Sequence, residues 1–247
     1  MKAADAQYIY TFAGWDKELA PVNGDVTYTA QFTAPPIVPE TPVTTYTIQL
    51  VDEDGELIEE KQVVEGSVIT APATNPTKAD DTQFTYEFHH WQGWTEGMTA
   101  TEDMTFTARY AATIQWSGVT KLSGAPTVTA DGWVEFRNWD PVLGLGTIDL
   151  SKYAKVIVTY TNGDGGTKMG DENDFFALTK VQEANPTVTS ANLLAKGQMT
   201  ASELTWADSR RDAVIDLTGV DYSGAVYFAF RYELCPVNVA SITFIPN

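Results

Sequence analysis

The sequence predicts an all-β protein that ends in an antiparallel β-sandwich of the jelly-roll type. Three observations support this fold class. The 247 residues are rich in Thr, Val and Tyr, and aromatic residues make up 12% of the chain, a composition that favours strands. Short segments of alternating apolar and polar residues follow one another with turn residues between them. No segment has the 3.6-residue apolar period of a convincing amphipathic helix.

Charge and cysteine content narrow the classes of function. The net charge of −18 argues against nucleic acid and anionic membranes as partners, because their phosphates attract Lys and Arg. It is compatible with neutral sugars and with calcium. Cys235 is the single cysteine, so neither an intrachain disulfide nor a cysteine-based zinc site is expected. No apolar run of about 18 residues occurs, and we expect no membrane insertion.

An internal repeat occupies the first half of the chain. The segment 10–34, "YTFAGWDKELAPVNGDVTYTAQFTA", is similar to the segment 86–112, "YEFHHWQGWTEGMTATEDMTFTARYAA". The second copy has an additional front half at 45–76, which is predicted to form a hairpin that turns at Asp54-Gly55. The matched positions are Tyr10, Phe12 and Trp15 with Tyr86, Phe88 and Trp91, and Val26, Tyr28, Ala30 and Phe32 with Met104, Phe106, Ala108 and Tyr110.

The motifs "YTFAGWDKEL", "VTYTAQF" and "YTIQLVDEDGELIEEKQVVEGSVI" resemble the internalin-type B-repeat, also called the Listeria–Bacteroides repeat. This resemblance implies a small β-grasp-like unit of extracellular bacterial proteins, a spacer or adhesive module without catalytic residues. The sequence "FHHW" replaces the usual Phe-x-Gly-Trp corner of that family, so we expect a distorted corner. Trp15 and Trp91 are expected to have structural packing roles. Adjacent strand residues point to opposite faces, and His89 and His90 are therefore not expected to share a metal.

The repeat sets the expected domain boundaries. They are a partial unit at 1–34, a proline-rich linker at 35–44, a complete unit at 45–112 and a β-sandwich at 113–247. The first copy lacks a front half, and we therefore expect the natural chain to begin further upstream. On that expectation, the absence of an apolar signal sequence from the first residues is uninformative.

The second half reads as eight or nine short strands. Its passages "GTIDLSKYAKVIVTYTN", "DAVIDLTGVDYSGAVYFAFRYE" and "VASITFIP" resemble jelly-roll carbohydrate-binding modules. The strands are expected at 113–119, 133–139, 146–150, 154–162, 174–181, 191–199, 212–217, 225–233 and 239–246.

The stretch "GWVEFRNWD" at 132–140 is the candidate binding face. In a strand, Val134 and Phe136 would face the core, and the opposite face would carry two tryptophans and two charges. A tryptophan ring offers a flat platform to the C–H face of a sugar, and charged side chains bond its hydroxyl groups. We expect a neighbouring strand and a loop to extend this face. The expected carbohydrate-binding residues are Trp133, Glu135, Arg137, Trp139, Trp206, Tyr227 and Arg231.

A purely structural role for this face stays open as the alternative. Tryptophan is mostly buried in proteins, and Glu135 and Arg137 could form an ion pair on a solvated face.

An acidic, glycine-rich segment at 162–174 is a second candidate site. Its Asp164, Asp171 and Asp174 could bind a structural calcium, although the spacing misses the EF-hand pattern and a plain acidic turn is the alternative. We expect no other cofactor.

No catalytic or phosphate-binding motif occurs, and we predict that the chain is not an enzyme. The leading hypothesis is a non-catalytic carbohydrate-binding module for plant cell-wall polysaccharide, with neutral β-glucan favoured. Its repeats would be spacers, and it would tether a covalently linked catalytic domain of a secreted, glycan-degrading bacterial protein to its substrate. The alternatives are an adhesin or cell-surface segment whose sandwich binds a protein partner, and a structural stalk.

Overall fold

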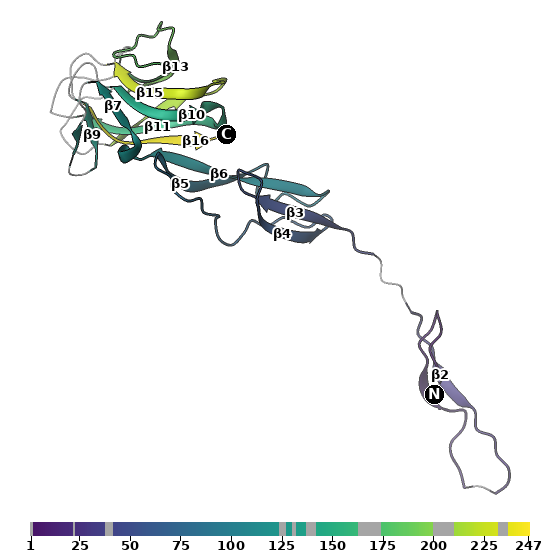
Figure 1. Cartoon of the computed structure of the whole chain (residues 1–247). Coiled ribbons are helices and arrows are strands. Elements are labelled where there is room, and N and C mark those ends of the chain that lie inside the picture. Colours follow the sequence, from purple (N-terminus) through teal and green to yellow (C-terminus); the bar gives the residue numbers. More distant parts are fainter. Residues whose placement is uncertain are drawn as a thin grey trace. The chain divides into compact units, whose positions relative to one another are not determined.

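The protein is an all-β structure, as the composition predicted. The computed structural model describes residues 2–21, 23–37, 42–123, 127–129, 132–136, 142–162, 174–199, 210–231 and 237–247. In these residues the regular elements are strands and two single-turn 3-10 helices (Figure 1). The chain divides into two compact units, residues 1–44 and 45–247.

The first unit is a two-stranded hairpin of β1 (Thr11–Trp15) and β2 (Ala30–Thr33). Aromatic rings meet on it edge to face, with ring centroids 5.5 Å apart for Phe12 and Trp15 and 6.3 Å apart for Trp15 and Tyr28. These rings are only partly covered by the rest of the unit: Phe12 is 50% exposed and Trp15 is 48% exposed. A two-stranded hairpin with an open aromatic face is marginally stable in water.

The second unit begins with four strands, here called the repeat part: β3 (Thr45–Val51), β4 (Leu57–Val64), β5 (Phe84–Gln92) and β6 (Met104–Ile114). β3 pairs antiparallel with β4 and parallel with β6, and β6 pairs antiparallel with β5. The predicted turn is present, and Gly55 adopts a φ of +86° that favours glycine. Alternation along the strands directs one face into a buried cluster that includes Ile48, Leu50, Ile69, Trp91, Phe106, Ala108 and Tyr110.

The remaining elements form the sandwich. The expected strand at 113–119 is wrong, because β6 ends at Ile114 and a 3-10 turn follows at Trp116–Gly118. The other elements are β7 (Thr120–Ser123), β8 (Thr127–Val128), β9 (Val134–Phe136), β10 (Val142–Asp149), η2 (Leu150–Lys152), β11 (Tyr153–Asn162), β12 (Phe175–Thr179), β13 (Leu193–Gln198), β14 (Arg211–Asp216), β15 (Ser223–Arg231) and β16 (Val237–Pro246).

Two sheets face each other across the sandwich core. One sheet has five strands in the order β13-β12-β15-β10-β7, and the other has nine, in which β14, β11 and β16 lie opposite the first sheet. Inward-pointing aromatic rings fill this core. Phe176 and Phe228, on neighbouring strands of the five-stranded sheet, stack at 5.4 Å, and Phe136 of the other sheet meets Phe230 edge to face at 5.3 Å. Burying each ring stabilises the fold by about 1.5–3 kcal/mol.

Strand β6 belongs to both parts of the second unit. Its first half pairs with β3, and its last residues pair with β16 of the sandwich (Figure 1). One nine-stranded sheet therefore extends from β4 to β14. Tyr86 on β5 packs against both buried clusters. Residue 112, where the sequence suggested that the repeat ends, lies inside β6. The repeat part is therefore joined to the sandwich by backbone pairing as well as by side-chain packing.

Candidate binding site

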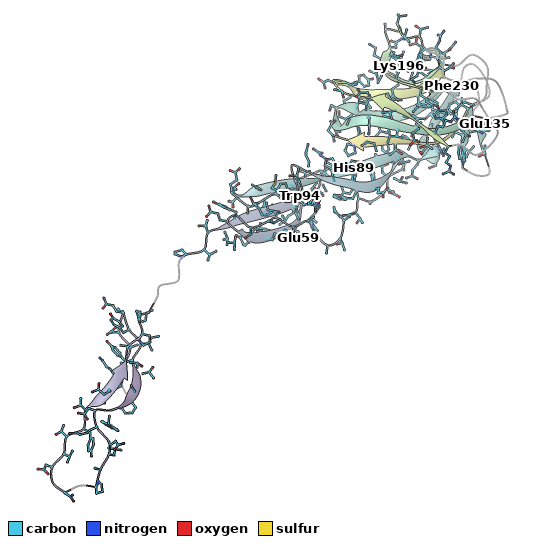
Figure 2. The ribbon with its side chains drawn as sticks, turned by 180° about the vertical axis from the view of Figure 1, so that it is seen from behind. Glu59, His89, Trp94, Glu135, Lys196 and Phe230 are labelled. Atoms are coloured by element: carbon cyan, nitrogen blue, oxygen red, sulfur yellow. The ribbon has the colours of Figure 1, made fainter. Side chains whose placement is uncertain are left out.

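Trp133 and Glu135 lie on the outer side of the nine-stranded sheet, as the alternation predicted. The intervening Val134 is 1% exposed and Phe136 is fully buried in the sandwich core, whereas Trp133 and Glu135 are half-buried. Figure 2 shows the position of Glu135 on the sandwich. Two hydrogen bonds fix the backbone of Trp133 ahead of β9. Its N–H donates to the Thr129 hydroxyl at 3.1 Å, and its carbonyl accepts from the Thr129 N–H at 2.7 Å.

Arg210 contributes a cation to the same site. Its guanidinium carbon lies 5.1 Å from the centroid of the Trp133 ring, within the range of a cation–π contact. Arg210 comes directly before β14, which is separated from β9 by β11 and β16 in the sheet. The sequence analysis missed this residue, because the two side chains are distant in the sequence and no local spacing connects them.

Tyr227 and Arg231 do not join this site. They lie on β15, whose neighbours are β12 and β10 in the five-stranded sheet, and not on a strand beside β9. Tyr227 alternates with the buried Val226 and Phe228, so it faces away from the core on the opposite layer of the sandwich. Alternation predicted the face of each strand correctly but could not assign the strand to its sheet.

Several predicted residues lie outside the described part of the chain. These are Arg137, Trp139 and Trp206 of the aromatic face and Asp164 and Asp171 of the calcium segment. Asp174 is described, is 3% exposed, and its backbone carbonyl accepts from the Met199 N–H at 2.9 Å and from Gln198 Nε2 at 3.0 Å. Within the described residues no group of three or more His, Cys, Asp or Glu side chains could hold a metal. Calcium binding stays a prediction.

A groove of about 450 Å³ lies along β5 in the repeat part. Phe88 and Trp91 line it from β5, and Trp94 lines it from the turn that follows. Trp91 is 5% exposed in the core, which confirms its predicted structural role, and Trp94 donates from its indole N–H to the Ile69 carbonyl at 3.2 Å. Polar groups at the groove come from His89, His90, Asn75 and Glu96. His89 and Trp94 are labelled in Figure 2.

A β-bulge gives the "FHHW" corner an unusual geometry. Phe88 pairs with Tyr110 and His90 pairs with Arg109, so His89 is an extra residue in β5. The bulge interrupts the alternation, and the Nδ1 atoms of His89 and His90 lie 2.8 Å apart. The expectation that these imidazoles point to opposite faces is therefore wrong. Burial lowers the pKa of His90, and the charges of His89 and Arg109 lower it further.

Comparisons with known proteins define no family. No protein-family model and no curated protein matches the chain. The solved structures that match include the cleaved adhesin domain of Lys-gingipain from Porphyromonas gingivalis, with a TM-score of 0.29 and 13% identity, over 56% of this chain and 90% of that one. A likeness of this size says nothing about function. The described part of the chain contains no helix long and apolar enough to cross a bilayer.

Proposed function

We propose that this chain is a non-catalytic adhesive segment of a bacterial surface or secreted protein, and that its sandwich binds a protein partner through the outer side of the nine-stranded sheet around Trp133. The observation that carries this proposal is the stack of Arg210 on the half-buried Trp133. Tryptophan and arginine are enriched among the residues that dominate protein–protein binding energy. The two hydrogen bonds with Thr129 order the Trp133 backbone and the Arg210 contact orders its ring, which lowers the ordering cost of binding.

The connection through β6 supports the same function. A spacer joined by a flexible linker would let the sandwich turn freely, whereas the shared strand and the packing of Tyr86 against both clusters fix the sandwich to the repeat part. This arrangement presents the Trp133 surface in a constant orientation. The net charge of −18 favours a neutral or basic contact surface on the partner.

Polysaccharide binding is a second candidate function, and the position of Glu135 favours it. Glu135 shares the outer face of β9 with the Trp133 ring, which places a hydroxyl-binding carboxylate beside an aromatic platform. In this function the chain would tether a covalently linked catalytic domain to a cell-wall polysaccharide, with neutral β-glucan as the first ligand to test. The negative charge of the Glu135 carboxylate and the negative net charge of the chain disfavour the binding of polyanionic glycans.

One experiment separates the two functions. The chain is tested by affinity gel electrophoresis against mixed-linkage β-glucan, xyloglucan, xylan, mannan and pectin, and by surface binding against purified extracellular-matrix and serum proteins. Trp133→Ala and Arg210→Ala are compared with Tyr227→Ala, a matched control on the opposite sheet.

Binding to a purified protein that is lost in Trp133→Ala and Arg210→Ala but kept in Tyr227→Ala supports the adhesive function. Retardation by a glycan with the same pattern of losses supports the second candidate instead. Binding of either ligand class that survives both substitutions shows that the Trp133 surface is not the site.

A further inference from the structure

The only two histidines of the chain meet at the bulge in β5. We propose that His89 and His90 form a two-imidazole site for a divalent transition-metal ion that accepts ligands at right angles, such as Cu²⁺ or Ni²⁺. Neither the adhesive function nor polysaccharide binding requires such a site. Imidazole is a preferred ligand of these ions, and square-planar or octahedral geometry is typical of them.

The distance between the two Nδ1 atoms selects the geometry. Imidazole nitrogens bind transition metals at about 2.05 Å, so two such bonds that span 2.8 Å enclose an angle of about 86° at the metal. This value is close to the right angle between adjacent ligands of a square-planar or octahedral ion. A tetrahedral ion such as Zn²⁺ requires the nitrogens to be about 3.3 Å apart, and the pair would have to separate.

The surroundings of the two rings allow chelation. Backbone atoms of Asn247 lie near His90 and favour a proton on its imidazole. A hydrogen bond to them, from outside the metal shell, would orient His90 as a ligand. In the present contact one Nδ1 carries the proton that the other accepts, and this proton passes to the Nε2 atom of its ring or to solvent when the ion binds. His89 is exposed, and its ring, now inclined by 79° to that of His90, can then turn to direct its Nδ1 lone pair at the metal. The bulged backbone keeps both side chains on one side of the strand while this happens.

Charge and ligand number limit the affinity. Arg109 lies across the strand pair from His90, and its cation opposes a bound dication, although Gln92 Oε1 accepts from Arg109 Nε at 3.2 Å and from Nη2 at 2.6 Å. Because the described residues supply no third histidine, cysteine or carboxylate ligand, water fills the remaining positions. The site is therefore expected to follow the general order of affinity, with Cu²⁺ bound most tightly.

The test uses the untagged full chain, Cu²⁺ in a non-coordinating buffer at neutral pH, isothermal calorimetry and electron paramagnetic resonance. We expect one Cu²⁺ per chain with two nitrogen ligands. His89→Gln and His90→Gln should each lower the affinity at least tenfold, and Arg109→Gln should raise it. Asn75→Ala is the matched control, because Asn75 lines the same groove without offering an imidazole. Thermal unfolding confirms that each variant is folded.

A second measurement needs no substitution. Since the chain has only two histidines, its NMR spectrum contains two sets of imidazole signals, and both should broaden together at substoichiometric Cu²⁺. Equal Cu²⁺ affinity in the wild type and in the double His→Gln variant would overturn the proposal, as would broadening of one imidazole alone. An intense tetrahedral absorption spectrum with Co²⁺ would overturn the right-angle geometry.

Discussion

The hydroxyl oxygens of Thr113 and Thr243 lie 2.9 Å apart, at the point where the repeat part meets the last strand of the sandwich. The backbone pairing between β6 and β16 consists of two residue pairs, Thr113 with Thr243 and Ala112 with Phe244. On the core side, the ring of Phe84, from the neighbouring strand β5, meets the ring of Phe244 on β16 edge to face at 5.9 Å. One polar and one aromatic contact therefore hold the two parts together from opposite faces of the sheet.

The Thr113–Thr243 contact should contribute measurably to stability. A hydrogen bond between neutral groups contributes about 0.5–1.5 kcal/mol net, and a single Thr→Val replacement leaves one hydroxyl without its partner. We expect Thr113→Val or Thr243→Val alone to lower the free energy of unfolding by about 1 kcal/mol, and the double variant to lose less than the sum. Urea denaturation of the four proteins measures the coupling, and strictly additive losses would show that the hydroxyls do not interact.

The two copies of the repeat corner should differ in their energetic importance. Trp91 is 5% exposed in the core of the second unit, whereas the matched Trp15 is 48% exposed on the hairpin. We expect Trp91→Ala to lower the free energy of unfolding of residues 45–247 by about 3–5 kcal/mol, because it leaves a large cavity. Trp15→Ala should change it by less than about 0.5 kcal/mol. Urea denaturation followed by near-ultraviolet circular dichroism makes the comparison, and similar losses in both variants would contradict it.

Sequence alone predicted the strands and their buried faces well. The alternation in "VEF" placed Val134 and Phe136 in the core, and the repeat match identified Trp91 as a packing residue. These successes share a cause, because burial of one face is a local property with a period of two residues. The turn at Asp54-Gly55 could be predicted for the same reason, because it depends on a single residue, Gly55, whose positive φ favours glycine.

The parts that sequence could not predict depend on long-range pairing or on a local irregularity. The contact between Arg210 and Trp133 exists only because β14 and β9 belong to the same sheet. Tyr227 was assigned to the wrong neighbour, because alternation does not say which strands pair. The bulge at His89 breaks the period on which the prediction of opposite faces rested.

The cation–π contact between Arg210 and Trp133 should contribute little to stability, and this contribution should require both side chains. Such contacts contribute about 0.5–1 kcal/mol at exposed sites. Arg210→Ala should lower the free energy of unfolding by roughly this amount in the wild-type background and by much less in a Trp133→Ala background. Thermal and urea denaturation of the single and double variants test this expectation. An equal effect of Arg210→Ala in both backgrounds would mean that the guanidinium contributes to stability through contacts other than the Trp133 ring.

Acid should destabilise the protein through His90. Burial, His89 and Arg109 lower the pKa of His90 below its unfolded value of about 6.5, so the unfolded chain binds a proton more readily than the folded one. The stability that neutral His90 provides is complete above that pH and is lost as the pH falls toward the lowered pKa. His90→Gln should therefore flatten the fall of the melting temperature between pH 7 and 5.5. A fall as steep as that of the wild type would show that other groups control this range.

Alkali should destabilise the sandwich through Tyr153 at the start of β11. Burial raises the pKa of Tyr153 to about 12, with smaller contributions from Glu53, Asp149 and Asp81, and its ring packs 5.3 Å from that of Phe244. Because the folded pKa lies above the unfolded value of about 10, this stabilisation is complete below pH 10 and is lost as the pH rises toward 12. The loss should amount to about 2 kcal/mol.

The comparison of wild type with Tyr153→Phe isolates this contribution, because Tyr86 and Tyr110 also have raised pKa values and act in both proteins. We expect the free energy of unfolding of the variant to fall less steeply between pH 10 and 12, while ultraviolet absorbance reports the loss of one high-pKa phenol. Parallel curves for the two proteins would mean that the Tyr153 hydroxyl ionises as easily in the folded chain as in the unfolded one, and that the packing against Phe244 does not protect it.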